Sequence, residues 1–226
     1  MNKHIDLGRI TLKVFQKSPF TLKKLDIGRY AKRRSRGIVF NTEIYQIDDI
    51  GQVSIMRLKA LMGLIKMESA IFTVKNKDVP LFNIDWIRAF GKETMICELY
   101  DVKLSPYPED KLAEFQAIAD HDASLENYIY DKDKPHWYDN ILYPCSYHKI
   151  SGRDFLRLTQ ASISYMKTFV RQLQETEECN REEKQAKISE YTEALFASDG
   201  PAVITVKKNF GEEDARKMIV ELLYGC

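Results

Sequence analysis

The first half of the chain is a series of apolar segments joined by very short connections. These segments are rich in β-branched and other apolar residues and span positions 37–47, 52–62, 67–76, 79–90 and 94–104. A parallel crossover needs a dozen or more residues, so connections this short join antiparallel neighbours. We therefore predict an antiparallel meander of about five strands for this half.

The second half is predicted to be mainly helical. A short helix is expected at 111–119. A longer helix should begin at Ser151, where Ser151 and Asp154 resemble a capping box before a stripe of apolar residues at helical spacing. The intervening positions 121–150 are polar and aromatic and match no regular pattern.

Two further helices have clear starting points. Acidic residues suit the first turn of a helix and predict starts at Glu182 and Glu212, and the earlier helix should run to about Phe196. Between them, Pro201 suits a first helical position. Strands followed by helices, without alternation of the two, predict the α+β class with an antiparallel sheet covered by helices.

Composition sets the broad class of protein. The chain has 226 residues, of which 44% are hydrophobic and 30% charged, as in ordinary globular proteins, and we expect a single domain, 1–226. No apolar stretch approaches the roughly 20 residues that a membrane helix needs, and the amino terminus has no apolar signal core. We therefore expect a cytoplasmic protein without a membrane partner. A net charge of +1 argues against a globally basic nucleic-acid binder.

The cysteines give no metal pattern. The four cysteines are widely scattered, and Cys145 with His148 is the one close cysteine–histidine pair. No second pair completes a four-ligand site, so we expect reduced thiols and no metal. The motifs typical of zinc proteases, serine hydrolases, phosphate loops and dinucleotide sites do not occur either.

Asp85 interrupts the apolar strand expected at 79–90. Alternation places Asp85 on the same face as Leu81, Asn83 and Ile87. A carboxylate on a covered face is costly unless it is paired, hydrogen-bonded or protonated, and burial raises its pKa. A carboxyl that stays protonated near neutral pH can donate a proton, so Asp85 is the first candidate for chemistry. The alternative is that Asp85 faces solvent or caps a local backbone group.

The following turn decides whether Asp85 has an acidic partner. A two-residue turn at Gly91 and Lys92 would pair Phe90 with Glu93 and place Asp85 directly opposite Glu98. Two opposed carboxyls would raise the pKa of one of them. A three-residue loop would shift this register and leave Glu98 as an exposed strand residue.

Two stretches of the sequence together resemble the ferredoxin-dependent bilin reductases. The first is VPLFNIDWI at 79–87 followed by LYD at 99–101, which is similar to the family's Leu-Pro-Ile-Phe-Gly-x-Asp strand and the apolar strand after it. The second comprises a helix bearing Tyr191, the turn SDGPA at 198–202 and the closing apolar segment 218–224, similar to the family's closing pattern.

The resemblance implies a three-layer α/β/α sandwich with a central antiparallel sheet. Enzymes of this family reduce linear tetrapyrroles such as biliverdin through substrate radicals, without a bound flavin, metal or nicotinamide. Ferredoxin supplies the electrons and the protein supplies the protons. The resemblance thus implies an oxidoreductase acting on CH–CH bonds, fed by ferredoxin or a similar iron–sulfur donor, with Asp85 as the main proton donor and Asp199 as a second one. The alternative for Asp199 is a plain helix cap.

The sequence also departs from the family. The phycocyanobilin-forming branch uses a glutamate and a histidine on the two preceding strands, and those positions fall here near Met56 and Glu68, with no histidine in 5–120. The two-aspartate phytochromobilin and phycoerythrobilin branches are therefore the better match. Gly200 is inserted in the turn, and Asn83 replaces the family's glycine. The red chlorophyll catabolite reductases share the same fold and are another candidate relative.

Further residues are candidates for contacts with a substrate or partner. Substrate-facing side chains are expected at Asn83, Lys59, Arg88 and Glu98. A basic cluster comprises Arg29, Lys32, Arg33, Arg34 and Arg36. The cluster could receive an acidic ferredoxin or bilin propionates, contact nucleic-acid phosphates, or be a solvated turn. The run at 136–138 (HWY) could fold over a flat ligand or form a surface loop.

Three functions follow from the sequence as hypotheses. The leading one is a linear-tetrapyrrole reductase in which Asp85 protonates the substrate. The second is a tetrapyrrole-binding protein on the same fold that performs no reduction. The third is a nucleic-acid or protein adaptor that uses the basic cluster, although the net charge argues against nucleic acid.

Overall fold

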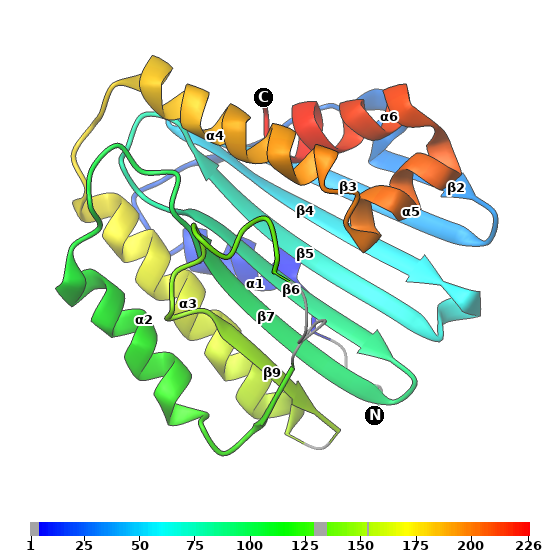
Figure 1. The fold of residues 1–226 in the computed structure, drawn as a ribbon, viewed down its shortest axis with the longest axis horizontal. Coiled ribbons are helices and arrows are strands. Elements are labelled where there is room, and N and C mark those ends of the chain that lie inside the picture. Colours follow the sequence, from blue (N-terminus) through cyan, green and yellow to red (C-terminus); the bar gives the residue numbers. More distant parts are fainter. Residues whose placement is uncertain (1–4, 129–134, 153) are drawn as a thin grey trace.

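A central antiparallel sheet organises the computed structural model, which describes residues 5–128, 135–152 and 154–226 (Figure 1). Nine described strands form it in the order β1-β3-β4-β5-β6-β7-β9-β8, with β2 paired to β3. The strands are β1 (Leu22–Lys24), β2 (Lys32–Ser35), β3 (Ile38–Ile47), β4 (Gly51–Ala60), β5 (Ile65–Val74), β6 (Leu81–Ala89), β7 (Lys92–Tyr100), β8 (Glu126–Asn127) and β9 (Tyr147–Ser151).

The helices fall on both sides of this sheet. They are α1 (Leu7–Phe15), α2 (Glu109–His121), α3 (Phe155–Glu175), α4 (Arg181–Ala197), α5 (Pro201–Phe210) and α6 (Glu212–Arg216), and α6 continues as a π-helical segment, Lys217–Leu223. No helix in the described ranges is long and apolar enough to cross a membrane.

The predicted meander is confirmed, because β3 to β7 pair with one another in sequence order. The short strands β1, β2, β8 and β9 and the helix α1 are additions that the sequence patterns do not single out. Each of these strands has at most five residues, which is too short for alternation to be distinctive.

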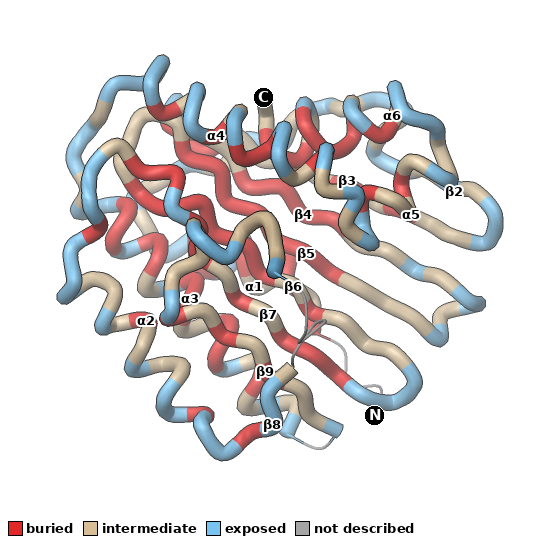
Figure 2. Tube along the Cα trace, in the orientation of Figure 1, coloured by how far each residue is buried: buried red, intermediate tan, exposed pale blue. Residues whose placement is uncertain are grey.

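Two apolar cores, one on each face of the sheet, account for the three-layer arrangement (Figure 2). On one face, α1, α2 and α3 cover aromatic side chains that include Phe82, whose ring centroid lies 4.9 Å from that of Phe169. On the other face, α4, α5 and α6 cover Ile71, Leu81 and Tyr100. The predicted α+β sandwich is therefore confirmed.

The α4–α6 layer covers only part of its face of the sheet. The strand ends near the β4–β5 and β6–β7 turns carry side chains that are half-buried, and no described helix lies over them (Figures 1 and 2). We call this region the open half; the half-buried residues that define it are Leu58, Met67, Asp85, Ile87 and Ile96.

The helix starts follow local capping rules. Helix α3 begins at Phe155 and not at Ser151, because Ser151 ends β9, although its Oγ still accepts the Asp154 N–H at 2.7 Å. The Asn180 side chain caps α4 by accepting two N–H groups of the first turn, and Pro201 is the first residue of α5 as predicted.

Candidate functional site

Asp85 lies on β6, on the face that α4–α6 partly cover, as alternation predicts. Ser69 is directly opposite on β5, and its hydroxyl donates a hydrogen bond to Oδ1 of Asp85. Burial raises the pKa of Asp85 to about 7, and the negative charge of Glu98 adds to this, while the Ser69 hydrogen bond and His148 oppose it. The carboxyl can therefore both hold and release a proton near neutral pH.

The register of the β6–β7 hairpin differs from the expected one. The two-residue turn consists of Phe90 and Gly91, both with positive φ, so Ala89 pairs with Lys92. The expectation that Asp85 faces Glu98 directly is therefore wrong: Asp85 pairs with Ile96. The shift is two residues along β7, so Glu98 keeps the same face, opposite Asn83, and remains a diagonal neighbour that acts on Asp85 electrostatically.

A histidine completes this group from the neighbouring strand β9. His148 pairs with Ile96 across the β7–β9 ladder and so shares the face of Asp85. Its Nε2 lies 3.0 Å from Oε1 of Glu98, with side chains that are 32% and 12% exposed. Asp85, Glu98 and His148 form the acid–histidine group of the site.

The sequence alone does not single out His148 for this role. It lies in the stretch 121–150 that has no clear pattern, and its spacing suggests only a pairing with Cys145. Cys145 is buried in the core of the opposite face and does not share a site with His148. The available signal was the short run SYHKI at 146–150, which can be read as a strand.

Three tyrosines extend the group under the helices. The Tyr100 hydroxyl donates to Oε2 of Glu98 at 2.6 Å, and the Asn83 amide donates to the Tyr224 hydroxyl at 3.3 Å. Tyr191 of α4 packs between them, with ring centroids 5.0 Å from Tyr100 and 5.7 Å from Tyr224. Burial raises the pKa of each phenol, so these hydroxyls stay protonated.

The loop before β9 folds over this tyrosine cluster. The Trp137 ring lies 5.2 Å from that of Tyr191, and Tyr138 lies 6.0 Å from Tyr100 and stacks with His136. The run at 136–138 thus belongs to the same side of the sheet as Asp85. Asp85 lies where this aromatic cover gives way to the open half.

Asp199 is not part of the acid–histidine group. It lies in the turn between α4 and α5 with a positive φ, its side chain is 59% exposed, and its carboxylate pairs with Lys207 at 2.8 Å. Within the described residues Asp199 forms no hydrogen bond or ion pair with Asp85, so the structure does not bring the two predicted proton donors together.

Two of the expected substrate contacts lie on the opposite face of the sheet. Arg88 is two residues from Trp86 in β6, so both side chains lie on the same face, where Trp86 is buried in the α1–α3 core. Arg88 therefore points away from the face of Asp85. Lys59 is two residues from Arg57 in β4 and so shares its face, which is the far face where Arg57 pairs with Asp6 and Glu43. The structure therefore does not place Lys59 and Arg88 on the face of Asp85, whereas Asn83 and Glu98 do share that face.

The basic cluster is partly used within the protein. Arg29 and Arg33 both pair with Asp214 in α6, and the Tyr30 hydroxyl donates to the same carboxylate at 2.8 Å. These contacts fix the β2–β3 hairpin to α6. The other three cations of the cluster, Lys32, Arg34 and Arg36, are exposed and form no salt bridge within the described residues.

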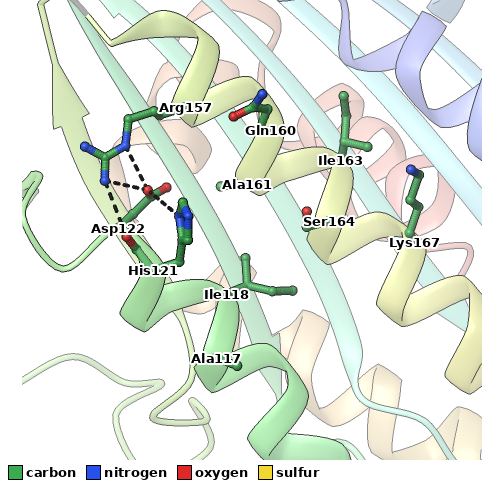
Figure 3. Close-up of a pocket in the computed structure, with 10 residues that line it drawn as sticks. All are labelled: Ala117, Ile118, His121, Asp122, Arg157, Gln160, Ala161, Ile163, Ser164 and Lys167. Atoms are coloured by element: carbon green, nitrogen blue, oxygen red, sulfur yellow. Dashed lines mark hydrogen bonds and ion pairs between the residues drawn. The ribbon is translucent and has the colours of Figure 1, made fainter.

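A surface hollow of about 540 Å³ lies between α2 and α3, in the helical layer remote from Asp85 (Figure 3). Its main charged group, Asp122, is already satisfied by Arg157 at 2.8 Å and by the Tyr147 hydroxyl. Among the described residues, no group of three or more His, Cys, Asp or Glu side chains could hold a metal ion.

The chain is thus an antiparallel α/β/α sandwich with an acid–histidine group on one sheet face. Its fold is similar to that of phytochromobilin synthase from tomato, in a crystal structure with biliverdin: the TM-score is 0.72 at 11% sequence identity, over 97% of this chain and 81% of that one. The family resemblance inferred from sequence is therefore supported at the level of the fold. No protein-family model matches the chain, and no curated protein sequence matches it.

Proposed function

We propose that the protein is a reductase of a linear tetrapyrrole in which Asp85 protonates the substrate. The observation that carries the proposal is the placement of Asp85, a carboxyl with a pKa of about 7, at the border between an aromatic cluster and the open half. The similar fold belongs to a protein crystallised with biliverdin, which supports the same class of ligand for this face.

The proposed chemistry balances with the groups present. Reduction of one carbon–carbon double bond consumes two electrons and two protons. Ferredoxin or a similar small iron–sulfur protein would deliver the electrons one at a time, without a cofactor bound in this chain. Asp85 gives the first proton to the pigment, and His148, whose Nε2 lies 3.0 Å from Oε1 of Glu98, supplies the second one.

The surroundings suit a flat, largely apolar ligand. The half-buried rings of Trp137 and Tyr138, which pack on the buried Tyr191 and Tyr100, provide stacking surfaces, and the half-buried aliphatic side chains of the open half provide an apolar floor. Asp85 lies between these two surfaces, where it can reach a pigment that spans them. Asp199, exposed and paired with Lys207, has no role in this mechanism.

Titration of the purified protein with biliverdin tests binding. Binding in the site should twist and protonate the pigment and so shift its visible spectrum. The spectral change should saturate near one equivalent of biliverdin. Asp85→Asn should keep pigment binding but lower turnover with reduced ferredoxin by about 10²-fold or more. The exposed Asp49→Asn serves as the matched control and should turn over like the wild type.

The outcome separates the reductase from its alternative. Binding and turnover that depends on Asp85 support the proposal, whereas absence of any spectral change excludes it. Binding without product, with ferredoxin and a chemical reductant both supplied, would assign the protein to non-catalytic tetrapyrrole carriers.

A further inference from the structure

The turns of two neighbouring hairpins place apolar side chains in solvent at one end of the sheet. The β4–β5 and β6–β7 turns lie side by side there (Figures 1 and 2). Ile65, which follows the first turn, pairs with Ala89, which precedes the second. Of the five exposed large hydrophobic residues among those described, four belong to these turns, with Met62 102% and Phe90 75% exposed. We call them the hairpin-tip patch: Leu61, Met62, Leu64 and Phe90.

The backbone makes these apolar residues unexpected. Leu61, Met62 and Phe90 have φ values of 48°, 54° and 51°, in the left-handed region that favours glycine and asparagine. An apolar side chain there costs on the order of 1 kcal/mol, and all three side chains stay largely in solvent. Both the turn geometry and solubility would favour polar residues at these positions, so the patch points to a surface that is covered in use.

Cations lie directly behind the patch on both hairpins. Lys59 pairs directly with Lys66, and Lys66 with Arg88, so like charges face one another across three strands, while Arg88 also pairs with Glu93 of β7. Lys92 adds a further exposed cation at the β6–β7 turn. Positions 58–67 and 87–92 contain no aspartate or glutamate.

The third hairpin turn extends the same edge. Val39, near the start of β3, pairs with Lys59, so the β2–β3 turn lies at the same end of the sheet. This turn contributes the exposed Arg34 and Arg36. The result is an edge in which apolar side chains occupy the apices of the β4–β5 and β6–β7 turns and cations lie one or two residues behind them.

We propose that this edge docks on an anionic membrane surface. Apolar apices backed by a row of Lys and Arg match the depth profile of a bilayer interface, where apolar groups enter the acyl boundary and cations remain at the phosphates. A nucleic acid would engage the cations but leave the aliphatic apices in water. The open half that contains Asp85 runs into this edge, so docking holds the candidate site beside the bilayer.

Co-sedimentation with vesicles tests the proposal independently of any bilin activity. The full-length protein should bind vesicles of phosphatidylcholine and phosphatidylserine at low salt, bind pure phosphatidylcholine much more weakly, and lose affinity as salt rises. The double variant Met62→Asn/Phe90→Asn should bind at least tenfold more weakly. Asparagine tolerates a positive φ, so the turns should keep their conformation, which circular dichroism checks.

Matched controls separate the edge from general effects. Leu156→Asn removes an exposed apolar residue at the start of α3 and should leave binding unchanged. Lys59→Glu/Lys92→Glu should abolish binding, whereas Lys187→Glu on the exposed surface of α4 should not. The proposal is overturned if the wild type does not sediment with anionic vesicles, or if the double asparagine variant binds as well as the wild type. It is equally overturned if that variant instead abolishes a self-association of the wild type, which would assign the patch to a second copy of the chain.

Discussion

Nε2 of His148 lies 3.0 Å from Oε1 of Glu98, and this contact joins β9 to β7 beside the carboxyl of Asp85. His148 belongs to β9, next to β7 in the strand order. The family resemblance places a histidine instead on one of the two strands that precede β6 along the chain. Glu98 and His148 both act electrostatically on the Asp85 carboxyl, whose pKa is raised.

Replacing this histidine tests its proposed role as the source of the second proton. His148→Gln should leave bilin binding within about twofold but lower turnover by about 10–100-fold, because the second proton loses its source. His121→Gln changes an exposed histidine that pairs with Asp122 in the far helical layer and is the control. Equal turnover of His148→Gln and the wild type would remove His148 from the mechanism.

The stability of the protein should depend on the protonation of Asp85. The folded pKa of about 7 exceeds the ordinary value of 3.8, so between these pH values the folded state holds a proton that the unfolded state releases. The free energy of unfolding therefore falls as the pH rises through this window. Asp85→Asn removes the buried charge and should unfold with a free energy about 1–3 kcal/mol higher than the wild type at pH 8.

Urea unfolding followed by tryptophan fluorescence measures this difference. At a pH near 4 the wild type is protonated at Asp85, so the two proteins should be about equally stable there. A variant that is less stable than the wild type at pH 8 would show that the ionised carboxylate is well stabilised in the fold. Higher stability combined with lower turnover would mark Asp85 as a residue that the fold retains at a cost in stability.

The sheet and the main candidate could be predicted from the sequence because both depend on local patterns. Short connections dictate antiparallel neighbours, and alternation fixes the face of Asp85. The same alternation also excludes Arg88 from that face, since 85 and 88 differ by an odd number. The position of Glu98 required the turn type, which depends on Phe90 adopting a positive φ, a conformation that the residue type does not favour.

The rest of the site depends on contacts between distant parts of the chain. His148 meets Glu98 only because a five-residue strand, β9, adds to the edge of β7. Tyr224 reaches Asn83 at the end of a π-helical segment whose carbonyl at Leu222 accepts a hydrogen bond from the Gln52 side chain. A helical period of 3.6 residues does not reveal a π-helix, so this placement lies outside what periodicity can predict.

Glu68 should fasten the amino-terminal helix to the sheet. Its buried carboxylate accepts the Leu7 N–H at 2.8 Å at the start of α1, and Arg57 lies 3.6 Å away. Glu68→Ala removes this acceptor and leaves a buried N–H and an arginine short of partners, so the free energy of unfolding should fall by about 2–3 kcal/mol. Amide exchange should quicken in α1 more than in α4.

The control for this prediction is Glu43→Ala, which removes another Arg57 partner but leaves the helix start intact. Burial raises the pKa of Glu68 to about 7, so the contribution of Glu68 to the free energy of unfolding depends on pH in the same direction as that of Asp85. Glu68→Ala and Glu43→Ala should therefore be compared at one pH. Unchanged exchange in α1 of Glu68→Ala would show that apolar packing alone holds the helix.

Lys184 should stabilise the strand that carries Asp85. This lysine of α4 is fully buried, and its ammonium donates to the carbonyl of Val79 at 2.7 Å and to that of Val102 at 2.8 Å. Lys184→Met keeps most of the apolar volume but leaves two buried carbonyls without a donor, so the free energy of unfolding should fall by about 2–4 kcal/mol. The exposed Lys187→Met on the same helix should change it by less than about 0.5 kcal/mol. Urea unfolding of both variants at pH 7 decides the matter: equal midpoints would mean that water replaces the ammonium, and that α4 is held over the tyrosine cluster by its aromatic contacts alone.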